Sequence, residues 1–286
     1  TDPSKVTYTN GVQNEWLVHP AFTASAENGG GFGEIAGIWV GKFETTGTEE
    51  NISVKPGEAS LRNMIINAQY HLALDATFGE KVNLNNHMTK NSEWGAVAYL
   101  AHSKYGTNSE KVERNTSTSC ITGGTENKSE IYKTNKEQST THNAYGVFDM
   151  NGGVYERTAS YVNYKENSNN LSIYGGTTKG DLYGEDTNEQ SISTKYKTVY
   201  EAQASNEKDS YELSKNKKGD SIYETSNSYS SNTGTWFNAC SVFPNTNGPF
   251  FMRGGDNDIE YSGIFYFGNA YGYAIDDNGF RVILIV

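Results

Sequence analysis

Cysteine and histidine are the side chains most often used as nucleophiles, general bases and transition-metal ligands, and this chain has few of either. Cys120 and Cys240 lie far apart, without CxxC spacing and without a histidine at metal-ligand spacing, which disfavours a zinc site. In a secreted protein they could form one disulfide; the alternative is two separate buried thiols. The five histidines form no HxxH or HExxH pattern, and we expect most of them to be structural or surface residues: His19, His71, His87, His102 and His142.

No other arrangement in the sequence indicates catalysis. It contains no P-loop, no Ser-His-Asp arrangement and no paired carboxylate site. Tyrosine is instead in excess, with 20 residues, and several of them stand near the C-terminal end among Asp, Asn, Ser and Gly. Tyrosine provides rigid, amphipathic contact area and is enriched on binding surfaces, although it is also common in β proteins for structural reasons. The residue types therefore favour recognition, with a tyrosine-rich β protein as the alternative.

Charge and hydropathy exclude several classes of partner. The 286 residues carry a net charge of −11 and no cluster of Lys and Arg, so we expect no nucleic-acid binding and no adsorption to anionic membranes. No apolar run is long enough to span a bilayer, so we expect no membrane insertion by this segment. The chain begins with Thr1 rather than Met, which is consistent with the removal of a start, signal or anchor segment.

Two stretches have the apolar periodicity of helices. In residues 58–79, the side chains at helical spacing are Leu61, Ile65, Ala68 and Leu72. In residues 89–106, Ser92 is a candidate N-cap, and Trp94 is expected to anchor the helix in the core. The apolar stripe of this second helix consists of Trp94, Val97, Ala98 and Ala101.

The other elements are expected to be strands and loops. Apolar residues from Ile35 to Phe43 predict a strand that is buried on at least one face. The stretch 163–233 is highly polar and has no visible core face beyond isolated residues such as Ile173 and Leu182. We interpret it as a long polar insertion whose loops pack on the main domain. Early helices followed by short, glycine-interrupted strands favour a single α+β domain over residues 1–286.

Four stretches occur in an order that resembles the formylglycine-generating enzyme-like proteins. They are NSEWGAVAYLAHSKYG, NAYGVFDMNGGVYERT, FFMRGGDN and NGFRVIL. The resemblance covers roughly residues 35–284 apart from the insertion, and the set is specific only as a whole. It implies a C-type lectin-like fold of the formylglycine-generating enzyme type, in which Arg253 and Arg281 would brace the scaffold.

The departures from that family bear on activity. Its enzymes use cysteines shortly after the Arg-Gly-Gly entry, where thiolates bind copper and activate oxygen. Residues 256–277 contain no cysteine, and neither Tyr nor Asp replaces a thiolate as a ligand of Cu(I). We therefore expect no enzyme activity and no redox cofactor.

The chain also resembles the variable proteins of diversity-generating retroelements, which include phage receptor-binding proteins and bacterial surface proteins. The stretches GIWVGKFETTGT, MTKNSEWGAVAYL and GDSIYETS are similar to surface proteins of gut Firmicutes. In retroelement systems a reverse transcriptase mutates template adenines, and changes to an AAC codon yield Asn, Asp, Tyr, Ser, Gly, Ala, Ile, Phe and others, but never a stop. Residues 256–273 all belong to that set except Glu260. The alternative is coincidence, because the same residues are common in ordinary loops.

The resemblance implies that residues 253–281 form a variable ligand-binding region on a solvent-facing sheet and its loops. The expected contact residues are Asp256, Asn257, Asp258, Ile259, Tyr261, Ser262, Tyr266, Asn269, Tyr271 and Tyr273. Tyrosines would anchor the contact, and an acidic surface suits a ligand of basic or mixed polarity. Alternatively, the acidic and amide residues at 256–258 form only a solvated turn. If the segment is a strand, Phe265 and Phe267 share one face, and we expect one of them in the core and Tyr266 exposed.

A calcium site is a further implication of the resemblance. In the enzyme branch the ion is bound at the Asp-Met-x-Gly-Asn-Val-Trp-Glu run. The matching positions offer side-chain oxygens from Asp149 and Glu156 and carbonyls from Gly152 and Val154, and oxygen ligands suit calcium. Gly153 stands where the family has Asn, so a purely structural turn is the alternative.

The sequence thus predicts a non-catalytic, hypervariable ligand-binding protein of the receptor or adhesin type. The resemblance implies an extracellular location on a bacterial surface or a phage tail, a macromolecular and preferably protein ligand, and a monomer. The alternatives are a degenerate formylglycine-generating enzyme-like oxidase and a calcium-assisted lectin.

Overall fold

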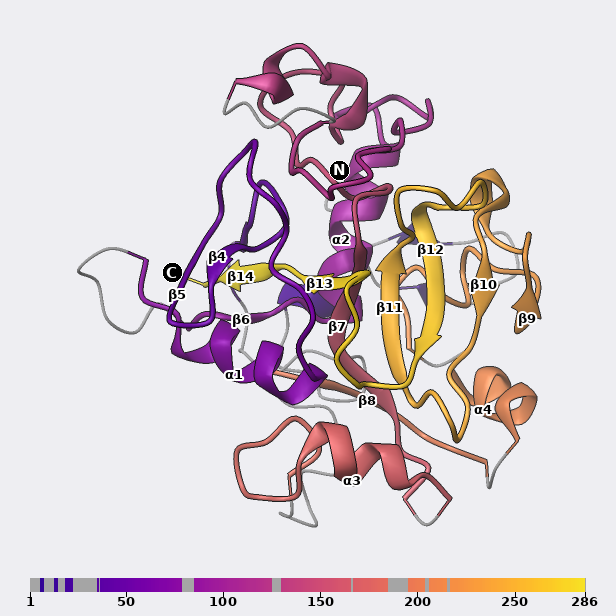
Figure 1. Cartoon of the computed structure of the whole chain (residues 1–286). Helices are drawn as coiled ribbons and strands as arrows, with labels where there is room; N and C mark the ends of the chain where they lie inside the picture. Colours follow the sequence, from indigo (N-terminus) through magenta and orange to yellow (C-terminus); the bar gives the residue numbers. More distant parts are fainter. Residues whose placement is uncertain are drawn as a thin grey trace.

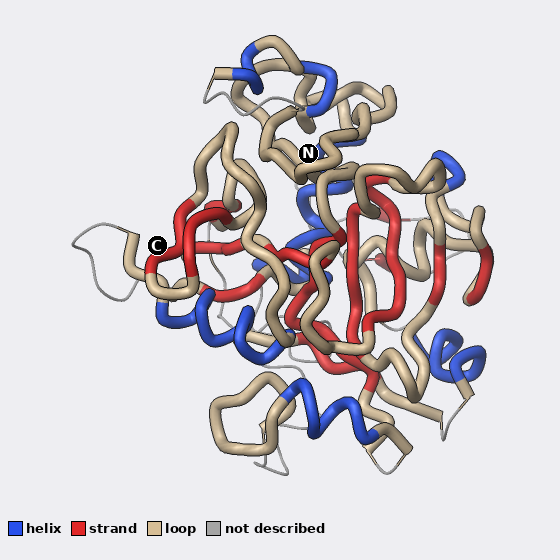
Figure 2. Tube along the Cα trace, in the orientation of Figure 1, coloured by secondary structure: helices blue, strands red, loops and turns tan. Residues whose placement is uncertain are grey.

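Strands form the centre of the molecule and long loops surround them (Figure 1, Figure 2). The computed structural model describes residues 6–7, 13–14, 19–22, 35, 37–78, 85–124, 130–165, 167–184, 195–203, 206–214 and 217–285. Within these residues, a mixed seven-stranded sheet and three smaller sheets are accompanied by four α-helices. The chain is therefore an α+β protein, as the sequence predicts.

The seven-stranded sheet has the order β13-β7-β11-β12-β10-β9, and β8 also pairs with β7. The bounds are β7 Tyr155–Val162, β8 Thr198–Tyr200, β9 Ser230–Ser231, β10 Ser241–Val242, β11 Phe250–Gly254, β12 Gly263–Ala270 and β13 Asn278–Phe280. Its middle is antiparallel, with β11 between β7 and β12, whereas β13 and β8 run parallel to β7. Every residue of β7 is buried, as expected for a central strand covered on both faces.

A three-stranded sheet has β14 (Val282–Leu284) between β3 (Trp39–Val40) and β6 (His87–Met88). Strand β13 ends at Phe280 and β14 begins at Val282, so the chain passes from one sheet to the other at Arg281. The remaining short elements are β1 Val6–Thr7, β2 Gln13–Asn14, β4 Thr46–Thr48, β5 Asn51–Ser53, and the 3-10 turns η1 Pro20–Phe22, η3 Ile131–Lys133, η4 Lys136–Gln138 and η6 Trp236–Asn238.

Helix α1 (Ile66–Asp75) is shorter than the sequence suggests, and its most buried residues are different ones. The predicted apolar stripe is confirmed in part, because Leu61, Ala68 and Leu72 pack partly buried against the core, although Leu61 precedes the helix and Ile65 is 37% exposed. The buried side chains are Ile66, Gln69, Tyr70 and Ala73. The stretch carries apolar residues on more than one face, and packing against the neighbouring strand β6 selects between them.

Helix α2 (Asn91–His102) confirms the second predicted helix and its anchor. Trp94 is fully buried, with Ala98 and Ala101 on the same face. The predicted cap is wrong, because Ser92 lies buried inside the first turn. Lys90 precedes the helix, and its backbone N–H donates to the Glu93 carboxylate at 2.8 Å.

The polar stretch 163–233 contributes more to the core than its composition indicates. It contains β8, α3 (Asn169–Gly175) and α4 (Glu207–Leu213). The expectation of no core face is wrong, because these core residues lie in it: Tyr164, Leu171, Leu182, Tyr183, Val199, Tyr200, Tyr211 and Ile222. Of the two residues expected to be buried, Leu182 is, whereas Ile173 is 60% exposed. Whether the stretch is an insertion relative to other proteins stays a prediction.

The first predicted strand is only the two residues of β3, and its Trp39 side chain is 68% exposed. Phe43 is buried beyond the end of the strand. No helix among the described residues has the length and hydropathy needed to cross a bilayer.

Candidate ligand-binding surface

Two loops in the 253–281 region emerge from opposite ends of strand β12. The first loop, residues 255–262, connects β11 to β12, and the second loop, residues 271–277, connects β12 to β13 (Figure 1). Eight of the ten candidate contact residues therefore lie on the two loops, and Tyr266 and Asn269 lie on the eight-residue strand between them. Met252, Tyr155 and Tyr266 form an apolar cluster on the sheet between the two loops.

Donors from distant segments hold the backbone of the first loop. The Cys240 N–H donates to the Tyr261 carbonyl at 2.7 Å, and the Arg114 guanidinium donates to the Ile259 carbonyl. Within the loop, the Asp256 carboxylate accepts the Ile259 N–H at 3.1 Å. The Asn257 amide donates to the Ser117 carbonyl at 2.7 Å. Asp256 and Asn257 thus both form hydrogen bonds within the protein. The alternative that these residues form only a solvated turn is therefore not confirmed for either side chain.

Donors from other segments also hold the second loop, through the main-chain carbonyls of five residues between 272 and 277. Backbone N–H groups of Ile66, Asn63 and Tyr155 donate to the carbonyls of residues 272, 275 and 277 at 2.9, 3.0 and 2.9 Å. The guanidinium of Arg157 donates to the carbonyl of residue 273 at 2.6 Å, and that of Arg62 to the carbonyl of residue 276 at 2.9 Å.

Except for the side-chain bonds of Asp256 and Asn257, these bonds share one property, which is that the acceptor in the loop is a main-chain carbonyl. A carbonyl accepts a hydrogen bond whatever side chain its residue carries. The donors lie outside residues 253–281, on segments that pack into the core. The conformation of the second loop is therefore specified largely without the identity of its side chains, whereas the first loop also uses the side chains of Asp256 and Asn257.

The predicted contact residues differ in exposure. Tyr261, Tyr271 and Tyr273 are 40%, 45% and 40% exposed, which is high for tyrosines that are not at chain ends. Asp258 is also exposed, and four further side chains are half-buried: Asp256, Asn257, Ile259 and Asn269. Eight of the ten predicted residues thus have accessible side chains, on the two loops and at the end of β12.

Two of the predicted contact residues are buried, so their assignment to the ligand surface is wrong. Ser262 donates to the Asn151 side chain at 2.9 Å. Tyr266 is 3% exposed and hydrogen-bonded to Tyr155, with the ring centroids 5.5 Å apart. Burial raises the pKa of the Tyr266 hydroxyl well above its ordinary value. The register of β11 against β12 shifts after Arg253. Tyr266 is buried because it packs with Tyr155 and Ala239 in a small apolar cluster.

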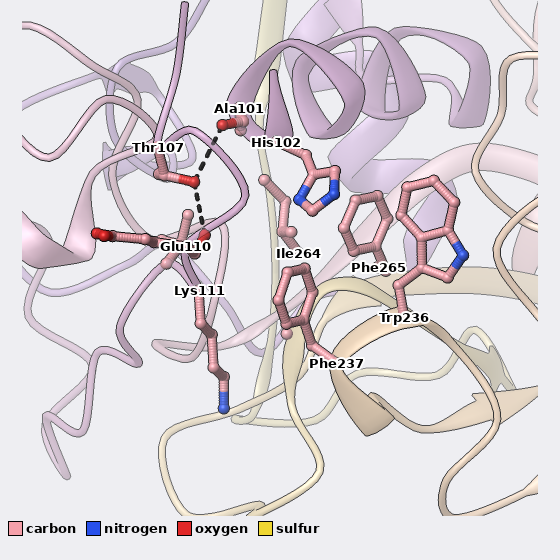
Figure 3. Close-up of a pocket in the computed structure, with 11 residues that line it drawn as sticks. Ala101, His102, Thr107, Glu110, Lys111, Trp236, Phe237, Ile264 and Phe265 are labelled. Atoms are coloured by element: carbon pink, nitrogen blue, oxygen red, sulfur yellow. Dashed lines mark hydrogen bonds between the residues drawn. The ribbon is translucent and has the colours of Figure 1, made fainter. Parts of the chain in front are cut away.

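Both phenylalanines of β12 are buried, whereas only one was expected in the core. Phe267 packs in the main core. The Phe265 ring lies among His102, Trp236 and Phe237, where three elements line a pocket on the other side of the strand (Figure 3). Its centroid is 5.2 Å from that of Trp236 and 6.1 Å from that of the nearly parallel Phe237 ring. Phe265 therefore belongs to the scaffold.

Buried residues also hold the strands between the loops. The Trp94 indole donates to the Ile264 carbonyl of β12 at 2.8 Å. Arg253 is fully buried and donates to the carbonyl of Asp220 at 3.0 Å and the hydroxyl of Ser221 at 2.6 Å. The prediction that Arg253 braces the scaffold is confirmed.

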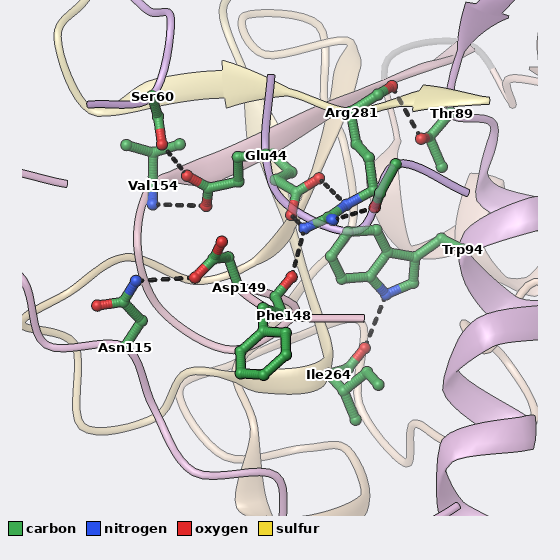
Figure 4. Close-up of polar contacts among 12 residues, drawn as sticks. Glu44, Ser60, Thr89, Trp94, Asn115, Phe148, Asp149, Val154, Ile264 and Arg281 are labelled. Atoms are coloured by element: carbon green, nitrogen blue, oxygen red, sulfur yellow. Dashed lines mark hydrogen bonds and ion pairs between the residues drawn. The ribbon is translucent and has the colours of Figure 1, made fainter. Parts of the chain in front are cut away.

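Arg281 has the same role at the junction of the two sheets (Figure 4). Its guanidinium donates to both carboxylate oxygens of Glu156, at 2.9 and 2.5 Å, and to the carbonyls of Gly41 and Phe148 at 2.6 and 2.9 Å. Burial alone would lower the pKa of Arg281, but the paired Glu156 carboxylate outweighs it and raises that pKa. Arg281 thus joins four segments, and its predicted bracing role is confirmed.

Two of the four residues expected to bind calcium, Asp149 and Glu156, lie near this guanidinium. Both Glu156 oxygens accept from Arg281, and Asp149 accepts from the Asn115 amide and the Gly123 N–H, each at 2.8 Å. The Val154 N–H donates to the adjacent Glu44, whose pKa is raised well above the ordinary range by burial and by the charges of Asp149 and Glu156. The carboxylates of Asp149 and Glu156 thus already have protein partners, and Glu156 is neutralised by Arg281, so this pair of side chains does not fit a calcium ion. No metal-binding group of three or more His, Cys, Asp or Glu occurs in the described part of the chain.

The two cysteines are free thiols in the structure, which is the second of the two alternatives. The Cys120 sulfur accepts from the Arg62 guanidinium at 2.9 Å, and Cys240 lies beside Tyr266 in the small apolar cluster on the sheet. Burial raises the pKa of both thiols. Protonated thiols in these positions act as packing residues.

Sequence reasoning missed three features of this surface. Ala274 and Asp276 are exposed in the second loop, and they could have been included because they lie in the same run as the predicted residues. Tyr174 of α3 lies against Tyr273, with ring centroids 6.0 Å apart. It comes from the stretch 163–233, and no pattern in the sequence connects it with the loops.

Comparison with known proteins adds no assignment, because no protein-family model and no curated protein matches the chain.

The buried ion pair predicts that the loss of Arg281 lowers the free energy of unfolding much more than the loss of an exposed cation does. Replacing Arg281 with Met leaves the Glu156 carboxylate buried without its counter-charge, so unfolding in urea should show a loss of about 3–5 kcal/mol. The control is Lys133→Met, which removes an exposed ion pair with Glu130 and should cost less than about 1 kcal/mol. Equal losses in the two variants would contradict the bracing role of Arg281.

The difference in burial predicts that two tyrosines of the 253–281 region contribute very different amounts to the free energy of unfolding. Tyr266→Ala removes a packed ring and should lower the free energy of unfolding by about 3–5 kcal/mol. Tyr271→Ala removes a largely exposed ring and should change it by less than about 1 kcal/mol. Chemical denaturation of the two variants measures both values, and a larger effect of Tyr271→Ala would show that the surface assignment is wrong.

Proposed function

We propose that the protein is a non-catalytic ligand-binding protein whose specificity is set by interchangeable side chains on the two loops. The observation that carries the proposal is the anchoring of both loops through main-chain carbonyls. Because the donors are constant and the acceptors belong to the backbone, the exposed side chains can change while the loop conformation persists. A surface built in this way suits a protein that must present many different side chains from one scaffold.

The composition of the region supports diversification by a retroelement. With the exception of Glu260, residues 256–273 are those reachable by changing the adenines of AAC codons. In this proposal the fold is C-type lectin-like, and residues 253–281 are the variable region of such a protein.

Burial reduces the number of positions at which a changed side chain would alter ligand binding. Ser262, Phe265, Tyr266 and Phe267 are buried and serve the scaffold. The proposed contact positions are Asp256, Asn257, Asp258, Ile259, Tyr261, Asn269, Tyr271 and Tyr273, with Ala274 and Asp276 added. Exposed tyrosines among short polar residues form the type of surface that binds proteins with little loss of side-chain entropy.

The location and the assembly state belong to the same proposal. The protein acts outside the cell, on a bacterial surface or a phage tail, and binds a macromolecular ligand, preferably a protein, as a monomer. Calcium is not part of the proposed function, because the Glu156 carboxylate is already paired with Arg281. The oxidase-like and lectin alternatives rest on analogy of fold, and no arrangement in the described residues favours either over binding by the loops.

The gene neighbourhood tests the proposed function without knowledge of the ligand. A reverse transcriptase gene should lie close to this gene, together with a near-copy of the DNA that encodes residues 253–281. Mismatches between the two copies should be confined to adenines of the template copy, and should fall mainly in the codons of the proposed contact positions. A neighbourhood with neither element, in several independent isolates, would reject the retroelement. Mismatches spread over all four bases would reject it as well.

A further inference from the structure

The geometry points to helix α3 as a fixed part of the ligand-binding surface, with Tyr174 as a constant anchor beside the interchangeable residues and with a basic protein surface as the partner. This inference rests on the proposed function. It adds a residue from the stretch 163–233, outside the region that would vary, and it states the charge of the ligand.

Three tyrosine rings form a continuous strip across α3 and the second loop. The Tyr174 and Tyr273 centroids are 6.0 Å apart in an edge-on arrangement, and those of Tyr273 and Tyr271 are 5.6 Å apart. Tyr174 is half-buried, and the other two are nearly half-exposed. One side of the strip therefore packs on the protein and the other faces solvent. A ligand that covers the tips of Tyr271 and Tyr273 would also cover the edge of Tyr174.

The position of Tyr174 relative to the loop is fixed by packing on both sides. Leu171 of α3 is fully buried, and the carbonyl of Gly175 accepts the Tyr183 N–H at 2.8 Å. Gly272, between the two loop tyrosines, has a φ of +97°, and a Cβ placed there would lie 2.7 Å from the Cβ of Tyr174. Only glycine fits this approach, so α3 and the turn are in direct contact.

The loops carry carboxylates without balancing side-chain cations of their own. From Gly254 to Phe280 there is no Lys, Arg or His, whereas five acidic residues occur there: Asp256, Asp258, Glu260, Asp276 and Asp277. The neighbouring cations are Arg62, Arg114 and Arg157, and each donates to a main-chain carbonyl of the loops.

A basic partner suits both parts of this surface. The carboxylates attract Lys and Arg side chains and would increase the rate of association. The faces of the exposed tyrosines bind the same cations and the apolar stems that carry them. Tyr174 is conformationally restricted before binding, so it would contribute contact area with little loss of entropy.

The test is a display library in which residues 258, 259, 261 and 269 carry the AAC-derived set while Tyr174, Tyr271 and Tyr273 are kept. The probes are lysozyme, which is basic, and α-lactalbumin, which has the same fold and is acidic. We expect binders mainly to lysozyme, with affinities that fall as salt increases. If neither probe yields binders, the proposed function fails. Equally frequent binders to α-lactalbumin would overturn the basic partner alone.

Substitutions of Tyr174 in the selected lysozyme binders then test α3. Tyr174→Ala should weaken binding about tenfold, whereas Tyr174→Phe should weaken it less than about threefold. The control Tyr105→Ala removes a ring that is 72% exposed in another part of the chain and should leave affinity unchanged. Unaltered binding by Tyr174→Ala would overturn the role of α3 and leave the proposed function intact.

A pair of charged substitutions separates contact from folding. Tyr174→Lys and Tyr174→Glu both remove the ring and both place a charge on α3, so a purely structural role predicts equal losses. If Tyr174 lies in the contact, the Lys variant should bind lysozyme at least about tenfold more weakly than the Glu variant. Equal affinities of the two variants would contradict the inference even if each is less stable than the parent.

Discussion

The buried ion pair between Arg281 and Glu156 is the interaction on which the rest of the structure depends. It lies where the chain leaves the large sheet for the small one, and it joins β7 to the segments that contain Gly41 and Phe148. A buried charge is tolerated only when its hydrogen-bonding groups are satisfied, and here the guanidinium has four acceptors. The residues on either side of Glu156 then hold the second loop, because the Tyr155 N–H and the Arg157 side chain donate to its carbonyls.

These contacts divide the residues that stabilise the fold from the exposed loop side chains that are proposed to bind the ligand. The core, the ion pair and the donors to the loop carbonyls lie outside the loops, and the exposed side chains of the loops contribute little to them. Arg62, Arg114 and Arg157 illustrate the separation, because each presents a charged donor to a backbone oxygen of the loops. Charge-assisted bonds of this type are stronger than neutral ones, which suits loops that must keep their shape when their sequence changes.

The sequence predicts those elements whose signals are local. Helix α2 and its Trp94 anchor follow from an apolar stripe, and the bracing roles of Arg253 and Arg281 follow from a family resemblance. The buried face of α1 does not, because Ile65 and Ile66 are equally apolar and only the neighbouring strand distinguishes them. The exposure of Tyr266 was predicted wrongly because its burial depends on packing with Tyr155 and Ala239, which are distant in sequence.

The tyrosines of the stretch 163–233 were missed for a different reason. Tyr200 is buried because its hydroxyl donates to Asp220, and Tyr164 because its hydroxyl donates to the Pro244 carbonyl. These partners are distant in sequence, and without them a tyrosine in a polar stretch looks like a surface residue. The contact of Tyr174 with the second loop is likewise tertiary. The sequence therefore indicates the region proposed for recognition, and the structure adds which of its side chains are exposed and which segment borders them.

The central claim is that the loops keep their conformation whatever side chains they carry. The most direct measurement is thermal unfolding of a panel of variants in which residues 258, 259, 261, 269, 271 and 273 carry different members of the AAC-derived set. The account predicts melting temperatures within about 5 °C of the parent, because exposed substitutions rarely change stability by more than about 0.5 kcal/mol. A spread of tens of degrees, or a panel that is mostly unfolded, would contradict it, because the loop side chains would then be part of what holds the fold together.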